Sequence, residues 1–344
     1  MRTIIALDAM GSDRAPKPEV EGAIQAARHY GVEVILVGRE AVLRDELYRH
    51  PSAMNLAISV CNATEVIAMR DKAAQTMRTK RDSSLRVGLR LVRDGRAHGF
   101  VTAGNTGAAM VTAKMVLGTL PGVDRPGLAA VFPTALGTAA IMIDVGANVD
   151  SKPHNLEQFA IMGEMYFRLI FNKTRPRVGL LSIGEEESKG NELTQHAYQL
   201  LKQLSLNFVG NVEGRDLYNG KVDVIVCDGF VGNVALKTSE GVAETVRYML
   251  KQSLKSTVTS QVGFLLSRRA FADFKRRLDY SEYGGAPLLG VKGACIICHG
   301  SSNPNAIKNA VRVASEYVNA AINEKIEREL AVVRERDVVP TAQV

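Results

Sequence analysis

The chain has 344 residues, of which 46% are apolar and 23% charged, a balance typical of a folded globular protein with a sizeable core. No run approaches the roughly 18 apolar residues that a membrane-spanning helix needs, and the amino terminus enters a strand-like stretch rather than a signal peptide, so we expect a cytoplasmic protein. The formal net charge of +7 favours acidic or anionic partners, but the sequence lacks the aromatic-rich basic block of a nucleic-acid-binding module.

One unit recurs along the chain: a short apolar run, then in most copies a loop rich in Gly, Asn, Asp or Ser, then a helical stretch. In chain order the apolar runs are Thr3–Leu7, Val32–Val37, Gly99–Thr102, Ala139–Ile143, Val178–Ile183, Val222–Cys227 and Ala294–Cys298. Helices are expected over about 18–29, 108–117, from about 155, up to 204, from about 239, and from 304 to about 322. This alternation predicts a layered αβα fold, Rossmann-like, with a mostly parallel sheet.

Two further segments are typical of β-hairpins. Residues 128–132 and 138–143 flank one turn, and residues 286–289 and 294–298 flank another, so part of the sheet is expected to be antiparallel. Since no Ser/Gly-rich linker interrupts the chain, residues 1–330 are predicted to form a single α/β domain, either as one body or as two lobes sharing a sheet. Residues 331–344 form a charged tail, and fraying is expected after about Glu324.

Six of the loops that follow the apolar runs are polar. Because ligands of open α/β sheets bind outside the carboxyl ends of the strands, we expect all six to meet at one edge of the sheet. Glycines let the backbone approach a ligand, and helix amino termini offer N–H groups to phosphate; the alternative is ordinary turn chemistry. The candidate substrate and phosphate residues are Asp8, Gly11, Asp13, Gly104, Asn105, Thr106, Gly107, Asp144, Asn148, Glu185, Asp228, Ser301 and Ser302.

Several kinds of site are disfavoured. The chain has no G-x-x-x-x-G-K-[ST] loop, no G-x-G-x-x-G after a strand, no G-x-S-x-G elbow and no H-E-x-x-H pair. Asp8, Asp144 and Asp228 are the carboxylates available to share a metal, but hydrogen bonds to loop N–H groups are the preferred interpretation, and we predict neither a metal nor a cofactor. The C-x-x-C-H string at Cys295 and Cys298 is interpreted as two buried thiols on a strand rather than a haem attachment site.

Two residues are candidates for the chemistry itself. Lys189 lies in an acidic loop after Glu185, Glu186 and Glu187. It is either a point charge that holds phosphate at the mouth of a helix or a surface lysine paired with those glutamates. Asn233 closes the loop before the helix expected from about residue 239; its amide either donates to a developing oxyanion or caps that helix.

At these loops the sequence resembles the bacterial phosphate acyltransferase family of phospholipid synthesis. Eight strings typical of that family occur in order between Thr3 and about Val318: DAMGSD (8–13), AGNTGA (103–108), DVGAN (144–148), IGEEESKG (183–190), GNVEGRDL (210–217), DGFVGN (228–233), YGGAPLLG (283–290) and HGSSN (299–303). Each string alone is weak, whereas eight with compatible spacing are specific. Ser12 and Ser182 depart from the family pattern, where glycine and asparagine are usual; Ser12 leaves the shape of the first loop open.

The resemblance implies a reversible reaction in which a long-chain acyl group passes from acyl carrier protein to inorganic phosphate. It implies a fold similar to phosphate acetyltransferases and isocitrate-dehydrogenase-like proteins, a homodimer, and a product that a membrane acyltransferase uses to acylate glycerol 3-phosphate. It assigns Lys189 to phosphate and oxyanion charge, and Asn233 to the oxyanion or to orientation of the carbonyl. Further groups are expected to complete the cradle: backbone N–H groups near Gly104–Gly107 and Gly146–Asn148, with Ser301 and Ser302.

An amphipathic helix is predicted over Gln261–Leu278, in an insertion at about 250–280. Its basic residues accompany one apolar stripe, which favours peripheral contact with an anionic membrane at its inner face. The alternative is that the phenylalanines pack into the core or into a dimer interface. The candidate membrane residues are Phe264, Leu265, Phe271, Phe274 and Leu278.

Three rival functions stay open at this point. A phosphate acetyl- or butyryltransferase that uses acyl coenzyme A would need the same crevice. A nicotinamide-dependent dehydrogenase is compatible with the fold, although no nucleotide fingerprint supports it. A non-catalytic scaffold would leave the six polar loops without a purpose. The sequence does not indicate the preferred acyl chain length.

Overall fold

The structure is a computed structural model that describes residues 2–277 and 282–338. Its strands are β1 (Ile4–Asp8), β2 (Glu33–Gly38), β3 (Ile58–Asn62), β4 (Gly99–Thr102), β5 (Gly127–Pro133), β6 (Ala139–Ile143), β7 (Arg177–Leu181), β8 (Asn207–Val212), β9 (Val224–Val226), β10 (Ala286–Leu289) and β11 (Ala294–Ile297). Within the described residues they form one 11-stranded sheet in the order β3-β2-β1-β4-β11-β10-β5-β6-β9-β7-β8. The predicted layered α/β fold and both hairpins are confirmed.

The sheet consists of two parallel halves that run in opposite directions. Strands β3, β2, β1, β4 and β11 are parallel to one another, and so are β6, β9, β7 and β8. Between the halves the direction reverses three times, at β11/β10, β10/β5 and β5/β6. The expectation that six polar loops leave one edge is therefore wrong: those after β1, β4 and β11 leave one edge, and those after β6, β7 and β9 leave the other.

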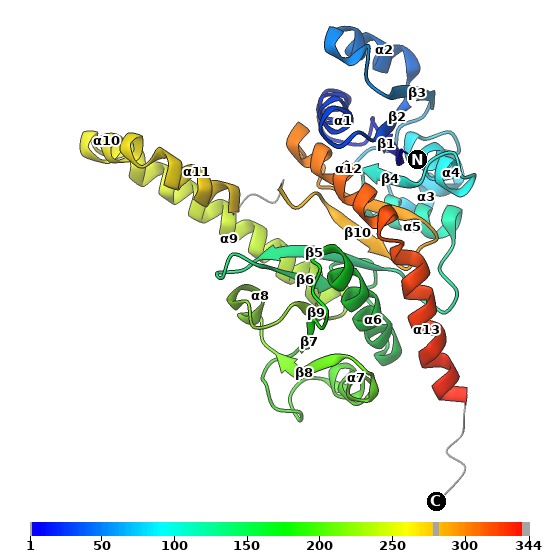
Figure 1. Ribbon diagram of the computed structural model, residues 1–344, viewed down its shortest axis with the longest axis vertical. Coiled ribbons are helices and arrows are strands. Elements are labelled where there is room, and N and C mark those ends of the chain that lie inside the picture. Colours follow the sequence, from blue (N-terminus) through cyan, green and yellow to red (C-terminus); the bar gives the residue numbers. More distant parts are fainter. Residues whose placement is uncertain (1, 278–281, 339–344) are drawn as a thin grey trace, which may run out of the picture.

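The helices alternate with the strands and cover both faces (Figure 1). They are α1 (Lys17–Tyr30), α2 (Glu40–Tyr48), α3 (Ala73–Thr79), α4 (Ser84–Arg93), α5 (Thr106–Leu117), α6 (Pro153–Ile170), α7 (Glu192–Gln203), α8 (Asp216–Asn219), α9 (Gly229–Lys255), α10 (Val258–Leu266), α11 (Arg268–Arg277), α12 (Pro304–Asn319) and α13 (Ile322–Val338). Several begin directly after an Asn or Asp whose side chain accepts from the first turn, as Asn105, Asp228 and Asn303 do.

The core lies on both faces of the sheet. Ile5 and Leu7 of β1 pack in one cluster with α1 and α12, whereas Ala6 between them packs in another with α4 and α5. Because successive side chains of a strand point to opposite faces, a strand buried on both sides has to be apolar throughout. This burial explains why the strands appear in the sequence as unbroken apolar runs.

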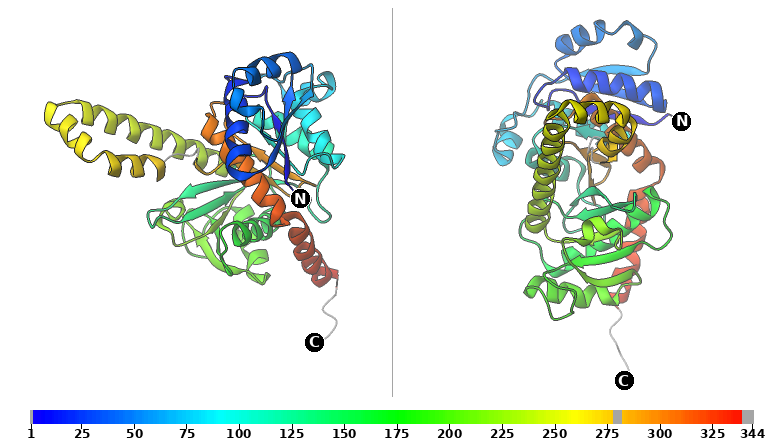
Figure 2. Two further views of the ribbon diagram at one scale, coloured as in Figure 1. Left: turned by 45° about the horizontal axis from the view of Figure 1, so that its top comes forward. Right: turned by 90° about the vertical axis from the view of Figure 1, so that its left-hand side faces the viewer.

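A helical arm projects from the body (Figures 1 and 2). Helix α9 leaves the second half of the sheet, and α10 and α11 turn back along it. The single helix predicted over Gln261–Leu278 is wrong: a break at Ser267 separates α10 from α11, and Leu278 lies outside the described residues. No helix in the described ranges is long and apolar enough to cross a membrane.

Two helix boundaries also differ from the prediction. Helix α9 begins at Gly229, ten residues before the expected start, so Asn233 lies inside the helix rather than in the loop before it. The tail expected to fray after Glu324 is instead helical in α13 as far as Val338. Ile326 and Leu330 are buried in the same cluster as residues of α6, which accounts for the order.

Candidate active site

The loop after β6 is built around the buried carboxylate of Asp144. Its Oδ1 accepts from the backbone N–H groups of Leu128, Gly146 and Ala147 at 3.0, 3.1 and 2.9 Å. Its Oδ2 accepts from the backbone and side-chain amides of Asn148 at 2.7 and 2.9 Å. Burial raises the pKa of Asp144, and these hydrogen bonds oppose the rise. The carboxylate therefore shapes the loop and is not aimed at a ligand.

The amino terminus of α9 is pressed against that loop. Asp228 caps it, because its Oδ1 accepts from the N–H groups of Phe230 and Val231 at 2.9 and 3.0 Å. A β-carbon on Gly232 would lie 1.9 Å from the carbonyl oxygen of Asp144, so only glycine fits there. This approach places Asn233, the next residue, beside Gly146.

The loops of the first half form a second hydrogen-bonded group. Thr102 donates to Oδ2 of Asp8 at 2.8 Å and accepts from the N–H of Gly104 at 3.0 Å. A β-carbon on Gly11 would lie 2.9 Å from the Cα of Gly104, so the loops after β1 and β4 are in contact. Asp13 joins the third loop, because its N–H donates to the carbonyl of Gly300 at 3.0 Å. Burial raises the pKa of Asp8.

The two loop groups share one cavity of about 480 Å³ between α5 and α9. Strands β5 and β10 form its floor through Leu128, Ala130, Val131 and Ala286. The first half contributes the start of α5 and the residues after β11; the second half contributes the Asp144 loop and one face of α9. The candidate residues on its wall are Thr106, Gly107 and Asn233.

The ends of the two helices differ electrostatically. Asn105, a neutral cap, accepts from the N–H of Ala108 at 2.9 Å, whereas Asp228 is a carboxylate cap. The carboxylate of Asp228 thus neutralises the positive end of the α9 dipole. The neutral Asn105 cap leaves the positive end of the α5 dipole without a negative charge from its cap. Thr106 and Gly107, the first residues of α5, line the cavity. The amino terminus of α5, which favours an anion, therefore faces the cavity.

Lys189 lies in the loop after β7, which leaves the same sheet edge as the Asp144 and Asp228 loops, but it does not line the cavity. Pairing with its glutamates is not observed: Glu185 pairs with Arg215 at 3.3 Å and Glu187 with Lys202 at 3.4 Å. In the part of the chain that the structure describes, the Lys189 ammonium has no ion-pair partner and is exposed.

Two other candidates have local structural partners. The Oγ of Ser302 is almost fully buried and donates to the carbonyl of His299, and Ser301 Oγ lies 2.8 Å from His299 Nδ1. Cavity residues that sequence reasoning did not assign include Lys237, Glu240, Tyr283 and His299. Two of them could have been found from the sequence, because Tyr283 and His299 are the first residues of two of the eight family-typical strings. Lys237 and Glu240 form an ion pair of 2.8 Å on the same face of α9 as Asn233.

Comparison with known proteins places this arrangement in a family. The profile of a family described as "Fatty acid synthesis protein" matches residues 3–325, almost the whole chain. The chain belongs to this family. A phosphate acyltransferase of Koribacter versatilis is 68% identical over 341 residues, covering 98% of this chain and 95% of the relative. One of Acidobacterium capsulatum is 65% identical over 331 residues, covering 96% and 98%. As a member of the phosphate acyltransferase family, the chain is an acyltransferase enzyme.

A solved structure supports the fold independently. A phosphotransacetylase of Streptococcus pyogenes is 16% identical and superimposes with a TM-score of 0.60 over 92% of this chain and 94% of the other. At that identity the likeness shows the shared architecture alone. It is the fold expected from the sequence.

Proposed function

We propose that the chain transfers a long-chain fatty acyl group from the thioester of acyl carrier protein to inorganic phosphate, reversibly. The observation that carries the proposal is the shared cavity, in which the uncompensated amino terminus of α5 faces the amide-bearing side of α9. The α5 wall is suited to bind an anion, and the α9 wall is suited to bind a carbonyl group. Phosphate and a thioester carbonyl are the two reactants of acyl transfer to phosphate. Membership of the phosphate acyltransferase family supports the same reaction.

Direct attack by phosphate suits the thiols of the site. Cys298 lines the cavity, yet burial raises its pKa to about 12, with Glu19 and Cys295 adding to the rise. It is a thiol at neutral pH and a poor nucleophile. A phosphate oxygen therefore attacks the thioester carbon, the tetrahedral oxyanion collapses, the C–S bond breaks, and the carrier leaves as a thiolate that takes up a proton.

The residues divide that work. The N–H groups of Thr106 and Gly107 hold phosphate, and the amide of Asn233 donates to the oxyanion. Lys189 does not line the cavity, and its exposed ammonium is proposed to favour phosphate through its positive charge at longer range. Asp8, Asp144 and Asp228 hold these loops in place through the hydrogen bonds given above.

The first experiment measures release of carrier thiol from palmitoyl carrier protein, with and without phosphate, together with formation of acyl phosphate. Phosphate-dependent turnover is expected, and coenzyme A thioesters should be poor substrates. Good turnover of acetyl or butyryl coenzyme A alone would favour the short-chain alternative. Reduction of a nicotinamide instead of thiol release would move the assignment to a dehydrogenase.

The assignment of Asn233 has a sharp test. Losing one oxyanion donor costs about 10²–10³ in rate, so Asn233→Ala should lower kcat by that factor with a smaller effect on KM. Thr238→Ala is the matched control, because Thr238 is exposed on the same helix and does not line the cavity. A wild-type kcat for Asn233→Ala would remove the residue from the mechanism.

The role of Lys189 is tested through phosphate. Lys189→Ala should raise the KM for phosphate by at least ten-fold, and Lys189→Arg should restore part of the affinity because it keeps the charge. An unchanged phosphate KM in the alanine variant would return Lys189 to the class of ordinary surface lysines.

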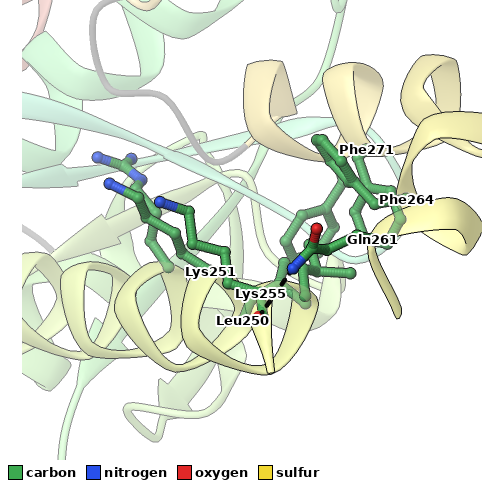
Figure 3. A pocket seen from close by; sticks show the side chains of 9 residues that line it. Leu250, Lys251, Lys255, Gln261, Phe264 and Phe271 are labelled. Carbon is green, nitrogen blue, oxygen red and sulfur yellow. Dashed lines mark hydrogen bonds between the residues drawn. The ribbon is translucent and has the colours of Figure 1, made fainter. Parts of the chain in front are cut away.

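We further propose that the helical arm makes peripheral contact with anionic membrane. Phe264 and Phe274 are each 43% exposed and Leu265 is 64% exposed, so these side chains are not part of the main core. Phe264, Phe271 and Phe274 line a hollow of about 850 Å³ together with Lys251 and other cations of α9. Figure 3 shows Phe264 and Phe271 across this hollow from Lys251 and Lys255. Aromatic and basic side chains on one arm suit an anionic lipid surface. Flotation with anionic but not with neutral vesicles is the expected result.

The same arm is the natural site for a homodimer, because its apolar side chains find no partner in the main core of the described chain.

The acyl phosphate would pass to a membrane acyltransferase that acylates glycerol 3-phosphate. Sedimentation of the purified protein tests the dimer, and flotation of Phe264→Ser/Phe274→Ser separates lipid contact from dimerisation. A dimer that dissociates in this variant without any change in vesicle binding would assign the phenylalanines to the interface alone.

A further inference from the structure

Positive charge is concentrated in two stretches of the chain. Residues 69–96 contain nine Lys or Arg and three Asp or Glu, a formal excess of +6, and residues 237–277 have the same excess. Since the whole chain carries +7, the remainder is net negative. The second stretch is the helical arm. The first forms α3, α4 and the residues beside them, a surface that we call the α3–α4 face.

The cations of the α3–α4 face are mostly uncompensated. Lys80 pairs with Asp71 at 2.6 Å and Arg93 with Asp94 at 2.8 Å. The exposed side chains without an ion-pair partner among residues 2–277 and 282–338 include Arg70, Lys72, Arg78 and Arg81.

Guanidinium groups crowd together on this face. Arg86 of α4 reaches across to α3, where its Nη1 donates to the carbonyl of Met77 at 2.9 Å. Its buried Nε has no hydrogen-bond partner among the described residues. Burial lowers the pKa of Arg86, and the positive charges of Arg90 and Arg81 lower it further. Among the described residues none of these three guanidinium groups forms an ion pair, although Arg90 interacts electrostatically with the carboxylates of Asp82 and Asp94. The local excess of positive charge is relieved when an anionic surface binds.

The α3–α4 face adjoins the cavity directly. The side-chain amide of Asn105 donates to the carbonyls of Met69 and Asp71 at 2.9 and 3.0 Å, which ties the start of the face to the amino terminus of α5. Thr106 and Gly107, the next two residues, line the cavity. A protein bound on the face would thus hold a thioester that it carries close to the cavity.

The two basic regions differ in what accompanies their charges. The arm has large apolar side chains exposed beside its cations, as a lipid surface requires. On the α3–α4 face, between residues 69 and 96, Met69 is the one large apolar side chain that is clearly exposed among those described. Charge without apolar area provides steering and orientation of a soluble partner rather than insertion into lipid.

We propose that the α3–α4 face docks the acidic protein that delivers the acyl thioester. The inference rests on the proposed function, whose donor is a carrier protein, and it assigns the surface on which that donor binds. Arg78 and Arg81 are exposed at the end of α3, and Arg70 and Lys72 flank the residues that Asn105 contacts beside the cavity. Two different surfaces then serve the two partners: this face binds the carrier, and the arm binds lipid.

The experiment compares wild type with Arg78→Ala/Arg81→Ala in steady-state kinetics with palmitoyl carrier protein. The KM for the carrier should rise about ten-fold at low salt, because steered association depends on these charges. The fall of kcat/KM between about 0.05 and 0.3 M salt should be shallower than in wild type. Arg28→Ala/Lys221→Ala is the matched control: both side chains are exposed, Arg28 lies in the last turn of α1, and Lys221 lies between α8 and the start of β9, so both are remote from the cavity loops.

The outcomes are distinguishable. A double variant whose carrier KM and salt response equal those of the control would overturn the inference even if the enzyme turns over. If wild type shows no turnover, the proposed function fails, and fluorescence anisotropy with labelled holo-carrier tests the face separately. If wild type binds the labelled carrier and the double variant does not, the α3–α4 face is still supported as the docking surface. If wild type does not bind the carrier, the inference is overturned. Loss of binding to phosphatidylglycerol vesicles, with the carrier KM unchanged, would assign the face to lipid instead.

Discussion

Replacing Glu19 by glutamine should remove a loss of stability that the wild-type protein undergoes as the pH rises from 5 to 8. Glu19 is the third residue of α1 and is fully buried. Neither of its carboxyl oxygens, nor the nearby Oγ of Ser12, has a hydrogen-bond partner of good geometry in the described structure. Burial raises its pKa from 4.5 to about 7; the charge of Asp8 adds to the rise, while Ser12 and backbone N–H groups oppose it. The thiol of Cys298 is also close enough for the charge of Glu19 to contribute to the raised pKa of that thiol.

The sign follows from proton binding. Between pH 4.5 and about 7 the folded protein holds a proton on Glu19 that the unfolded chain has released. The stability contributed by this proton is fully present below the pKa of Glu19 in the unfolded chain. It is lost as the pH rises through the pKa of Glu19 in the folded protein. At 1.36 kcal/mol per pKa unit the full loss is about 3 kcal/mol. Glutamine has no proton to lose, so the difference between the two proteins should grow with pH.

Guanidinium unfolding of wild type and Glu19→Gln at pH 5, 6, 7 and 8 measures that difference. The free energy of unfolding of wild type should fall by about 2–3 kcal/mol relative to the variant across this range. Glu21→Gln is the control for losing a carboxyl from the same helix on its partly exposed side. Parallel curves for wild type and Glu19→Gln would refute the reasoning, because they would mean that Glu19 is ionised in the folded protein at every pH tested.

Two further predictions concern how the cavity and the second half of the sheet are held. Gly232→Ala should destabilise the protein by about 3 kcal/mol and reduce activity, since its β-carbon meets the carbonyl of Asp144; Gly241→Ala, in open space on the same helix, should stabilise by up to about 1 kcal/mol. Asp223→Asn should cost about 2 kcal/mol at pH 7, because Arg177 hydrogen-bonds this nearly buried carboxylate and, with other donors, lowers its pKa against the effect of burial. That stabilisation is present above the unfolded pKa of about 3.9 and is lost as pH falls through the lower folded value, so denaturation at pH 7 and pH 3 measures it.

The strands were predictable because their signal is local. Gly99–Thr102 and Ala139–Ile143 are apolar runs that end at Ala-Gly and Asp-Val-Gly turns, and the structure has them with those bounds. The reversal of the sheet was not predictable, because it depends on the pairing of β10 with β5 and of β11 with β4, each across more than 100 residues. Without the pairing order, six similar loops were expected at one edge.

The start of α9 shows a different limit. Val231 and Val234, with Gly229 and Gly232, weaken the local helix signal, so the helix was expected only from Ser239. The tertiary contact with the Asp144 loop and the Asp228 cap override that propensity. Asn233, a candidate because of the DGFVGN string, lines the cavity, and its role in the reaction stays a prediction. Lys237 and Glu240 were missed because their helical spacing from Asn233 becomes visible only when the helix begins at Gly229.

The opposed halves of the sheet also explain a division of tasks at the cavity, which one substitution tests. If Asp228 neutralises the α9 terminus and leaves phosphate to α5, Asp228→Asn should keep the helix capped, since asparagine caps as well as aspartate, while it removes a negative charge near the anion. Stability should change by less than about 0.5 kcal/mol, and the KM for phosphate should fall two- to ten-fold. A higher phosphate KM with unchanged stability would contradict this division, because the carboxylate would then itself contact the phosphate or a proton on it.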